Sequence, residues 1–281
     1  MEVVKTKAEA KQKIGLWKKQ GLKIGFVPTM GYLHKGHLSL MELSKKRADK
    51  SVISIFVNPT QFGPSEDFER YPRDIQRDLE LSNSVGVDLV FMPEVKEMYP
   101  EPIKTWVTVE DLTNNLCGKS RPGHFKGVAT VVTKLFNIIQ PDIAVFGQKD
   151  YQQVQVIKRM VRDLDIPVKI IMAPIVREKD GLAMSSRNTY LSKEERKSAI
   201  CLFKALNLAK ELIKEKGIKK TKELKDQLEK FIHSFPFTKI DYIFIGDPEE
   251  LTETSSITLP TLVALAVYVG TTRLIDNEVI T

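Results

Sequence analysis

PTMGYLHKGH, residues 28–37, joins a short apolar run to an amphipathic segment. The apolar run is KIGFV, residues 23–27, and apolar residues recur at helical spacing from Leu38 onward. The expected order is strand, turn and helix. Glycine at 31 and 36 lets a ligand approach the backbone, and the start of a helix offers unpaired N–H groups and a positive dipole end. This pattern predicts a nucleotide phosphate site in the turn.

Two of the four histidines of the chain, His34 and His37, stand in this turn. Three residues apart at the start of a helix, both imidazoles would face the same anion. A zinc site is one alternative, but the neighbouring sequence lacks the cysteines or further histidines that would complete a tetrahedral set. A second alternative is that the two histidines only complete the turn and have no functional role. The flanking glycines and the preceding strand favour phosphate contact.

The composition is typical of a globular protein that neither crosses a membrane nor carries a disulfide framework. The chain has 281 residues, enough for roughly two domains, and is 42% hydrophobic and 28% charged. Its first residues are charged, unlike a signal peptide, and its longest apolar run, Leu262 to Val269, is far too short for a membrane span. Cys117 and Cys201 lie far apart. We expect a cytoplasmic protein with no membrane partner.

The net charge of +7 is compatible with nucleic acid or with small anionic substrates. Many lysines of the last third alternate with glutamates, as in Lys210-Glu211, which is typical of a solvated helix face. The chain also lacks a stripe of basic and aromatic residues. Nucleic-acid binding therefore stays an alternative, and small anions are favoured.

Up to about residue 176, apolar strands alternate with helices, which predicts parallel pairing with crossovers. Besides the opening unit, we expect strands at 51–57, 87–92, 105–109, 142–146 and 168–176, and helices at 7–21, 74–84, 125–139 and 151–164. Beyond this point, helices at 193–216 and 221–235 precede strands at 240–245, 262–269 and 273–280. The predicted fold is α/β: a Rossmann-like doubly wound sheet at 1–176, then a smaller α+β domain with an antiparallel sheet at 177–281.

Polar clusters follow the ends of the expected strands: PTMGYLHKGH, NPTQF, GQKD and MSSRN. The carboxyl ends of the strands of such a sheet meet at one edge, where ligands bind. Lys149 would meet a polyphosphate as a point charge, and Ser185, Ser186 and Arg187 would close over it. Neutral amides at Asn58, Gln61 and Gln153 suit hydroxyl groups and a carboxylate, although each alone could be an ordinary loop amide.

Other motifs are weaker or absent. Gly118-Lys119-Ser120 is no Walker A loop, because Thr113 stands where the first glycine is needed and no strand precedes it. No G-x-G-x-x-G follows a strand, so hydride transfer has little support. Asp78, in an acidic helical segment, is either a Mg²⁺ ligand or a surface charge.

PTMGYLHKGH, FVNPTQF, YPRD, RPGHFKGV, FGQKDYQQ and MSSRN together resemble the pantothenate synthetase (pantoate–β-alanine ligase) family of the HxGH nucleotidylyltransferase-like superfamily. The resemblance covers nearly the whole chain. It implies that ATP drives condensation of pantoate with β-alanine to pantothenate through a pantoyl adenylate, with release of AMP and pyrophosphate. It also implies Mg²⁺, a homodimer and a C-terminal lid. The alternative within enzymes is an adenylyltransferase that acts on a phosphorylated small molecule.

The resemblance implies a role for each matching position. The ATP contacts would be Met30, Gly31, Tyr32, Leu33, His34, Lys35, Gly36, His37, Gly147, Gln148, Lys149, Asp150, Val176, Met184, Ser185, Ser186 and Arg187. Of these, His34, His37, Lys149 and Arg187 would be catalytic, with His37 as proton donor. Gln61 and Gln153 would clamp pantoate, Asn58 and Arg121 would lie in or beside the same pocket, and Asp78 would stand on the side of the Mg²⁺ ion.

Overall fold

The turn at residues 28–37 connects β2 (Ile24–Thr29) to α2 (Lys35–Arg47), as the sequence predicts. This is a computed structural model that describes residues 1–64 and 66–281. β2 lies inside a sheet of six parallel strands in the order β1-β4-β3-β2-β5-β6. The other five strands are β1 (Glu2–Val4), β3 (Lys50–Ile55), β4 (Leu89–Phe91), β5 (Ile143–Gly147) and β6 (Lys169–Ala173).

The strand order places a ligand crevice beside β2. From β2 the chain moves through β3 to β4 on one side, and it then returns to pair β5 with the other side of β2. The boundary between β2 and β5 is therefore the point at which the winding reverses, and ligands bind outside the carboxyl ends of the strands at such a point. The turn before α2 follows β2, and GQKD closes β5.

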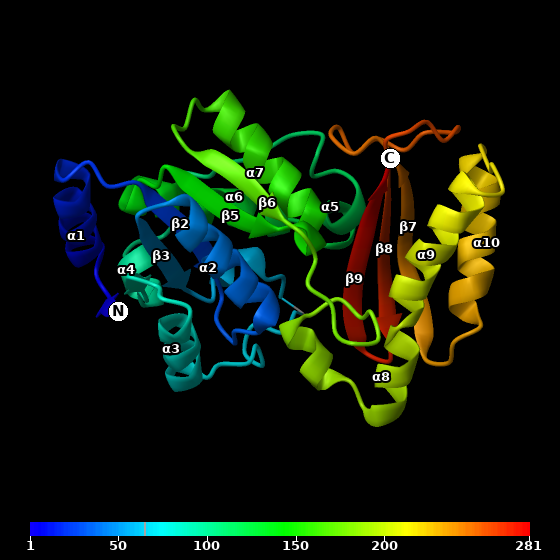
Figure 1. Cartoon of the computed structure of the whole chain (residues 1–281), viewed down its shortest axis with the longest axis horizontal. Helices are drawn as coiled ribbons and strands as arrows, with labels where there is room; N and C mark the ends of the chain where they lie inside the picture. Colours follow the sequence, from blue (N-terminus) through cyan, green and yellow to red (C-terminus); the bar gives the residue numbers. More distant parts are fainter. Residues whose placement is uncertain (65) are drawn as a thin grey trace.

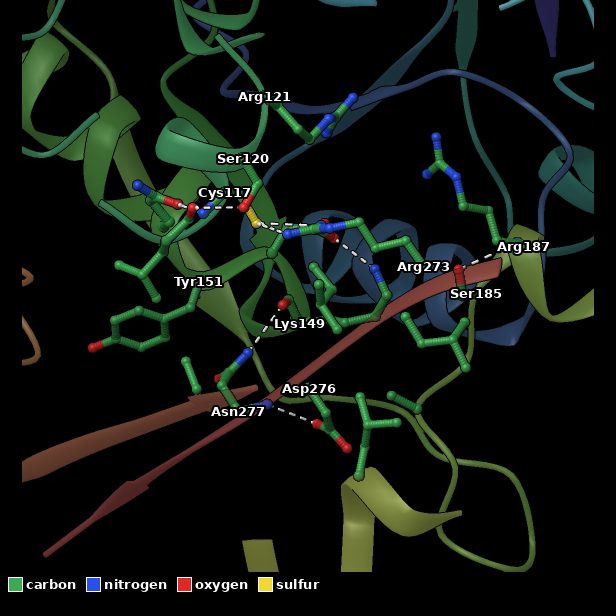
Figure 2. A pocket seen from close by; sticks show the side chains of 18 of the residues that line it. Cys117, Ser120, Arg121, Lys149, Tyr151, Ser185, Arg187, Arg273, Asp276 and Asn277 are labelled. Atoms are coloured by element: carbon green, nitrogen blue, oxygen red, sulfur yellow. Dashed lines mark hydrogen bonds and ion pairs between the residues drawn. The ribbon is translucent and has the colours of Figure 1, made fainter. Parts of the chain in front are cut away.

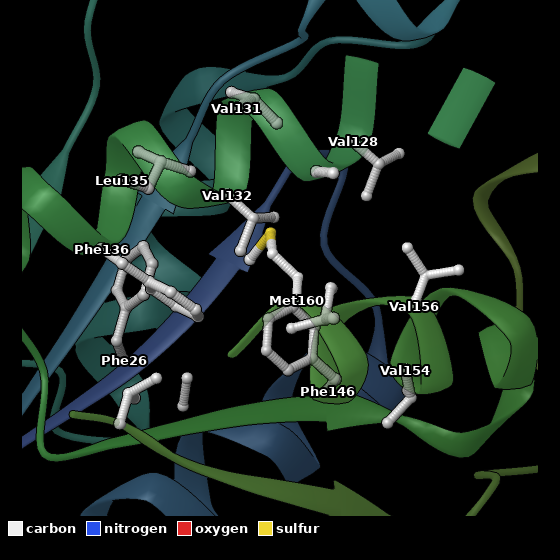
Figure 3. Packing of buried hydrophobic residues seen from close by; sticks show 14 of the residues in the cluster. Phe26, Val128, Val131, Val132, Leu135, Phe136, Phe146, Val154, Val156 and Met160 are labelled. Carbon is white, nitrogen blue, oxygen red and sulfur yellow. The ribbon is translucent and has the colours of Figure 1, made fainter. Parts of the chain in front are cut away.

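Helices cover both faces of this sheet (Figure 1). α1 (Lys7–Lys19), α6 (His124–Ile139) and α7 (Tyr151–Asp163) pack on one face, and α2 with α3 (Ile75–Ser84) packs on the other. Figure 3 shows the first of these cores, where Phe26 of β2 meets Phe136 of α6 edge to face at 6.4 Å between ring centroids. Shorter segments are α4 (Val95–Met98), α5 (Leu116–Ser120) and 3₁₀ turns at Pro59–Gln61, Gln148–Asp150 and Ser186–Tyr190.

The C-terminal part has a three-stranded antiparallel sheet, β7 (Thr238–Gly246), β8 (Thr261–Val269) and β9 (Thr272–Ile280). α9 (Cys201–Lys214) and α10 (Thr221–His233) cover one face of it, and α8 (Lys193–Ala199) precedes them. On the other face, Phe244, Leu262 and Ala264 belong to the same hydrophobic cluster as α6 and α7. The predicted fold class is therefore confirmed, and the small sheet packs directly on the first part of the chain.

Local details differ from the predictions. The strand expected at 105–109 is wrong: this segment has no strand, and the Val107 N–H donates to Thr130 Oγ1 of α6 at 3.0 Å. The helix expected at 193–216 divides into α8 and α9 at Ile200, which caps the end of α8 and the start of α9. β6 ends at Ala173, before Pro174, which has no N–H for a ladder. The edge strand β1 is absent from the predictions.

Two further expectations concern the chain as a whole. Among the described residues, every helix is too short or too polar to span a membrane. The division at residue 176 stays a prediction; it falls just after β6, at the start of the segment that leads to Ser185.

Candidate active site

One buried carboxylate holds the backbone of the turn after β2. Asp78 of α3 is 1% exposed, and its two oxygens accept the backbone N–H groups of Tyr32 and Leu33, each at 2.7 Å. Tyr32 has a φ of +50° and Gly31 a φ of +83°, a conformation that a β-carbon disfavours. A β-carbon at Gly31 would also lie 2.9 Å from Asp78 Oδ2. The carboxylate therefore stabilises a strained turn.

The two histidines of the turn are held in one tautomer. The Gly36 N–H donates to Nδ1 of His34 at 3.1 Å, and the His34 N–H donates to Nδ1 of His37 at 3.3 Å. Since Nδ1 is the acceptor in both rings, the proton of each neutral imidazole is on Nε2. Burial lowers the pKa of His34 to about 4 and that of His37 to about 3. Both rings are thus neutral at pH 7 and present an Nε2–H donor.

Two cavities meet at this edge of the sheet. The smaller, about 210 Å³, lies beside the histidines, and the larger, about 730 Å³, lies between the two parts of the chain (Figure 2). The residues that line both are Lys149, Asp150, Gln153, Ser185 and Arg187. Polar groups from the turn after β5, from α7 and from the segment before α8 therefore converge on one continuous site.

Two cations at the site are held by carboxylates of the protein. Lys149 Nζ donates to Asp150 Oδ2 at 3.1 Å. Arg187 makes two hydrogen bonds with Asp67, from Nε at 3.0 Å and from Nη2 at 2.9 Å. These bonds lower the pKa of Asp67 against the effect of burial, which alone would raise it. Asp67 thus occupies the Nε and Nη2 edge of the Arg187 guanidinium.

The three predicted amides, Asn58, Gln61 and Gln153, all line the smaller cavity, and Asn58 orients the amide of Gln61. Asn58, 1% exposed, donates to Gln61 Oε1 at 3.0 Å and accepts from the Tyr99 hydroxyl at 2.9 Å. Because its oxygen is occupied, Gln61 directs its Nε2 toward Met30, whose sulfur lies 3.3 Å away in the smaller cavity. Gln153 lines both cavities, and its side chain has no hydrogen-bond partner among the described residues.

His124, at the start of α6, supports the same region. Its Nδ1 lies 2.8 Å from the Gln61 carbonyl, and its Nε2 lies 3.1 Å from Arg121 Nη1. A guanidinium only donates, so Nε2 accepts and Nδ1–H donates to Gln61. Arg121 also forms a double hydrogen bond with Glu66, at 2.7 and 2.6 Å.

The structure brings most of the predicted site residues together. The smaller cavity is lined by Met30, His34, Gly36, His37, Asn58, Gln61, Gly147, Val176, Met184 and Ser186, in addition to the residues shared with the larger one. Arg121 lines the larger cavity. Neither cavity is lined by Gly31, Tyr32, Leu33, Lys35 or Gln148. The Leu33 side chain is buried in the core, so only the backbone of this residue could contact a ligand.

The expectation that Asp78 stands beside Mg²⁺ does not fit the structure. Both of its oxygens are occupied by backbone N–H groups, and it lines neither cavity. Among the described residues, no three His, Cys, Asp or Glu side chains form a group that could hold a metal ion. The side chains that the structure describes therefore do not make a protein cage for Mg²⁺.

Some residues that line the cavities are not predicted from the sequence. Tyr71, Glu66 and Asp67 line the cavities, yet only Tyr71 falls in a quoted motif, YPRD. Asp276 and Asn277 of β9 also line the larger cavity, and the expected strand at 273–280 gives no sign of it.

The buried histidines should make the protein less stable in acid. An unfolded histidine has a pKa near 6.5, so the unfolded state binds more protons than the folded state below that pH. Burial lowers the pKa of His124, like that of His34, to about 4. Stability should therefore fall from pH 6.5 toward pH 4, by up to about 3 kcal/mol for each such histidine.

Urea unfolding of wild type and of His124→Asn at pH 7 and pH 5 would measure this contribution. The variant should lose less of its unfolding free energy on acidification, because one proton-binding group of the unfolded state is gone. His233→Gln, on the exposed end of α10, is the control. The same pH dependence in wild type and His124→Asn would contradict the assignment.

Comparison with known proteins identifies what the chain is similar to. A family model for Pantoate-beta-alanine ligase matches residues 2–279. The chain is 59% identical over 280 residues to pantothenate synthetase of Caldicellulosiruptor saccharolyticus and 56% identical over 280 residues to that of Moorella thermoacetica, covering 100% of this chain and 99% of each relative.

Solved structures agree with these relatives. The structure of pantothenate synthetase from Thermus thermophilus superposes with a TM-score of 0.92 at 47% identity, covering 99% of both chains. The Francisella tularensis pantoate-beta-alanine ligase, solved with β-γ ATP and β-alanine, gives a TM-score of 0.82 at 36% identity, covering 99% of this chain and 97% of that one.

Proposed function

Because the chain belongs to the pantoate–β-alanine ligase family, it condenses pantoate with β-alanine at the expense of ATP, and we propose that the reaction proceeds through a pantoyl adenylate. In the first step, a carboxylate oxygen of pantoate attacks the α-phosphorus and the bond to the leaving pyrophosphate breaks. In the second step, the β-alanine amine attacks the acyl carbon and loses a proton, and the bond to AMP breaks. The products are pantothenate, AMP and pyrophosphate.

The convergence of donors on one cavity at the switch point of the sheet carries this proposal. The Nε2–H groups of His34 and His37 come from the turn after β2, Lys149 from the turn after β5 and Arg187 from the segment before α8. Neither step needs a covalent bond to the enzyme, so catalysis consists of positioning and of stabilising charge on the phosphates. Such a set of donors suits that task.

We assign the histidines as hydrogen-bond donors to the phosphates. With its pKa lowered to about 3, His37 is neutral at pH 7, and a neutral imidazole is a poor acid but a good donor. The fixed tautomer directs that donor to the ligand before ATP binds. This differs from the proton-donor role that the family resemblance implies for His37.

Lys149 would contact the α-phosphate, and the Ser185–Arg187 segment the β- and γ-phosphates. Asp67 holds Arg187 in the structure, so the triphosphate must displace this carboxylate. Asp150 would bind the ribose, and Val176 and Met184, which line the smaller cavity, would flank adenine.

Gln61 and Gln153 would clamp pantoate. Neutral amides bind its carboxylate and hydroxyl groups without neutralising the carboxylate that must attack. Asn58 acts through Gln61, whose amide it orients, and Arg121 stands at the rim, where a β-alanine carboxylate would pass. Mg²⁺ is proposed to enter as part of the substrate, bound to the ATP phosphates, because the described residues offer no group of three side chains that could hold a metal ion. We further propose a homodimer located in the cytoplasm, on family resemblance.

Omission of single substrates tests the proposal. Pyrophosphate exchange into ATP should require pantoate and proceed without β-alanine, and AMP should accumulate with pantothenate only when all three substrates are present. Exchange that depends on a phosphorylated acceptor and ignores pantoate would favour an adenylyltransferase instead. Tight, salt-sensitive oligonucleotide binding without turnover would favour the nucleic-acid alternative.

A further inference from the structure

Strand β9 of the C-terminal sheet reaches the turn that carries Lys149. Asn277 is 2% exposed, and its Nδ2 donates to the Gln148 carbonyl at 3.0 Å and to the Lys149 carbonyl at 2.9 Å. Both amide hydrogens are therefore used on adjacent carbonyls of one short turn. Figure 2 shows Asn277 next to Lys149 at the cavity.

The preceding residue, Asp276, contacts the segment that leads to Ser185 and Arg187. Asp276, also 2% exposed, accepts two hydrogen bonds from Arg177, at 2.6 and 3.0 Å. Arg177 in turn donates to the Gly181 carbonyl at 3.0 Å. It lies at the base of the segment that continues to Ser185 and Arg187, and the guanidinium fixes the bend in that segment.

Two neighbouring side chains of one strand thus hold two loops that are far apart in sequence. The backbone N–H of Asn277 also donates to Asp276 Oδ1 at 2.8 Å, so the Asp276 carboxylate is fixed relative to the backbone of β9. Residues on adjacent positions of a strand point to opposite sides, which explains how one dipeptide contacts both loops. Both side chains are engaged by these contacts with the two loops.

We infer that Asp276 and Asn277 are positioning residues that set the distance between the Lys149 turn and the Ser185–Arg187 segment across the ATP site. The inference rests on the proposed function, because it takes these two elements as the phosphate contacts. A shift of about 1 Å in a reacting group costs on the order of 100-fold in rate. The C-terminal domain therefore contributes to adenylate formation through β9, in addition to any movement as a lid.

Asn277→Asp is the sharpest variant, since it keeps the shape of the side chain and removes both N–H donors. We expect kcat/KM for ATP in pantoate-dependent pyrophosphate exchange to fall roughly 10- to 100-fold, ATP binding to weaken, and KM for β-alanine to change less than twofold. At lower pH the new carboxyl gains a proton and can donate one hydrogen bond. The deficit relative to wild type should therefore shrink as the pH falls.

Glu278→Gln, at the next position of β9, is the matched control and should behave as wild type. Asn277→Ser keeps one donor without adding a charge, so it should show a smaller loss, and it replaces Asn277→Asp if that variant does not fold. A loss of kcat in proportion to a loss of folded protein, with KM for ATP and the pH dependence unchanged, would show a structural role only and overturn the inference.

Lys149→Ala in the same assay separates this inference from the proposed function. An inactive Lys149→Ala enzyme together with wild-type behaviour of Asn277→Asp would overturn the positioning role alone. If the wild-type enzyme shows no pantoate-dependent exchange, the proposed function is overturned. Calorimetric titration of ATP would then decide the positioning role. Unchanged ATP affinity in Asn277→Asp would contradict that role, and weaker affinity would support it.

Discussion

Replacement of Lys149 with alanine should lower pantoate-dependent pyrophosphate exchange by roughly 10²- to 10³-fold, the loss typical when one donor to developing charge is removed. In the structure, the Lys149 ammonium contacts Asp150, and its side chain is 21% exposed at the cavity. A partly exposed ion pair of this kind contributes little to stability. The melting temperature should therefore stay close to that of wild type.

Rapid-quench measurement of pantoyl adenylate in a single turnover would detect the lower rate of adenylate formation directly. Lys46→Ala, on the exposed face of α2, controls for the change in net charge. Lys149→Arg should recover only part of the rate, because a planar guanidinium does not place its charge where a compact ammonium does. A near-normal burst of adenylate in Lys149→Ala would refute the assigned role.

His37→Ala should cause a loss of similar size, about 10²-fold or more in kcat/KM for ATP, since it removes the Nε2–H donor. It also removes the Nδ1 acceptor of the His34 N–H, a bond of 3.3 Å. That second loss should lower the free energy of unfolding by only about 1 kcal/mol. Activity and stability should thus change by very different amounts.

His37→Asn separates the two functions of this side chain. Its amide oxygen lies near the place of Nδ1 and can still accept from His34, but nothing replaces the Nε2–H. We expect stability to recover and activity to remain low. Because His37 is neutral well above its pKa of about 3, the wild-type rate should not titrate with this group between pH 6 and 9. An unfolded His37→Ala protein, or an active His37→Asn enzyme, would contradict the assignment.

The features of the site that the sequence predicts are those with local causes. The strand, the turn and the two histidines lie within 14 residues, from Ile24 to His37, and spacing alone places both imidazoles at the start of α2. The position of Lys149 follows from the rule that polar residues after parallel strands share an edge. Helix and strand periodicity likewise predicts most of the sheet.

Features that depend on packing between distant segments could not be read in this way. Asp78 stabilises a turn that lies 45 and 46 residues away in sequence, and only the structure shows that both of its oxygens are used there. Asn277 contacts Lys149 across 128 residues because β9 packs beside the Gln148–Asp150 turn. The end of α8 at Ile200 has no proline or glycine beside it that would predict it from the sequence.

The central claim, a pantoyl adenylate formed by carboxylate attack on the α-phosphorus, is tested most directly by the fate of the carboxylate oxygens. Pantoate labelled with ¹⁸O in its carboxylate should be converted in the presence of ATP and β-alanine, and the products analysed by mass spectrometry. The attacking oxygen stays with phosphorus when the amine expels AMP. We therefore expect one ¹⁸O atom in each AMP and none in pyrophosphate; unlabelled AMP, or label in orthophosphate formed together with ADP, would contradict the account.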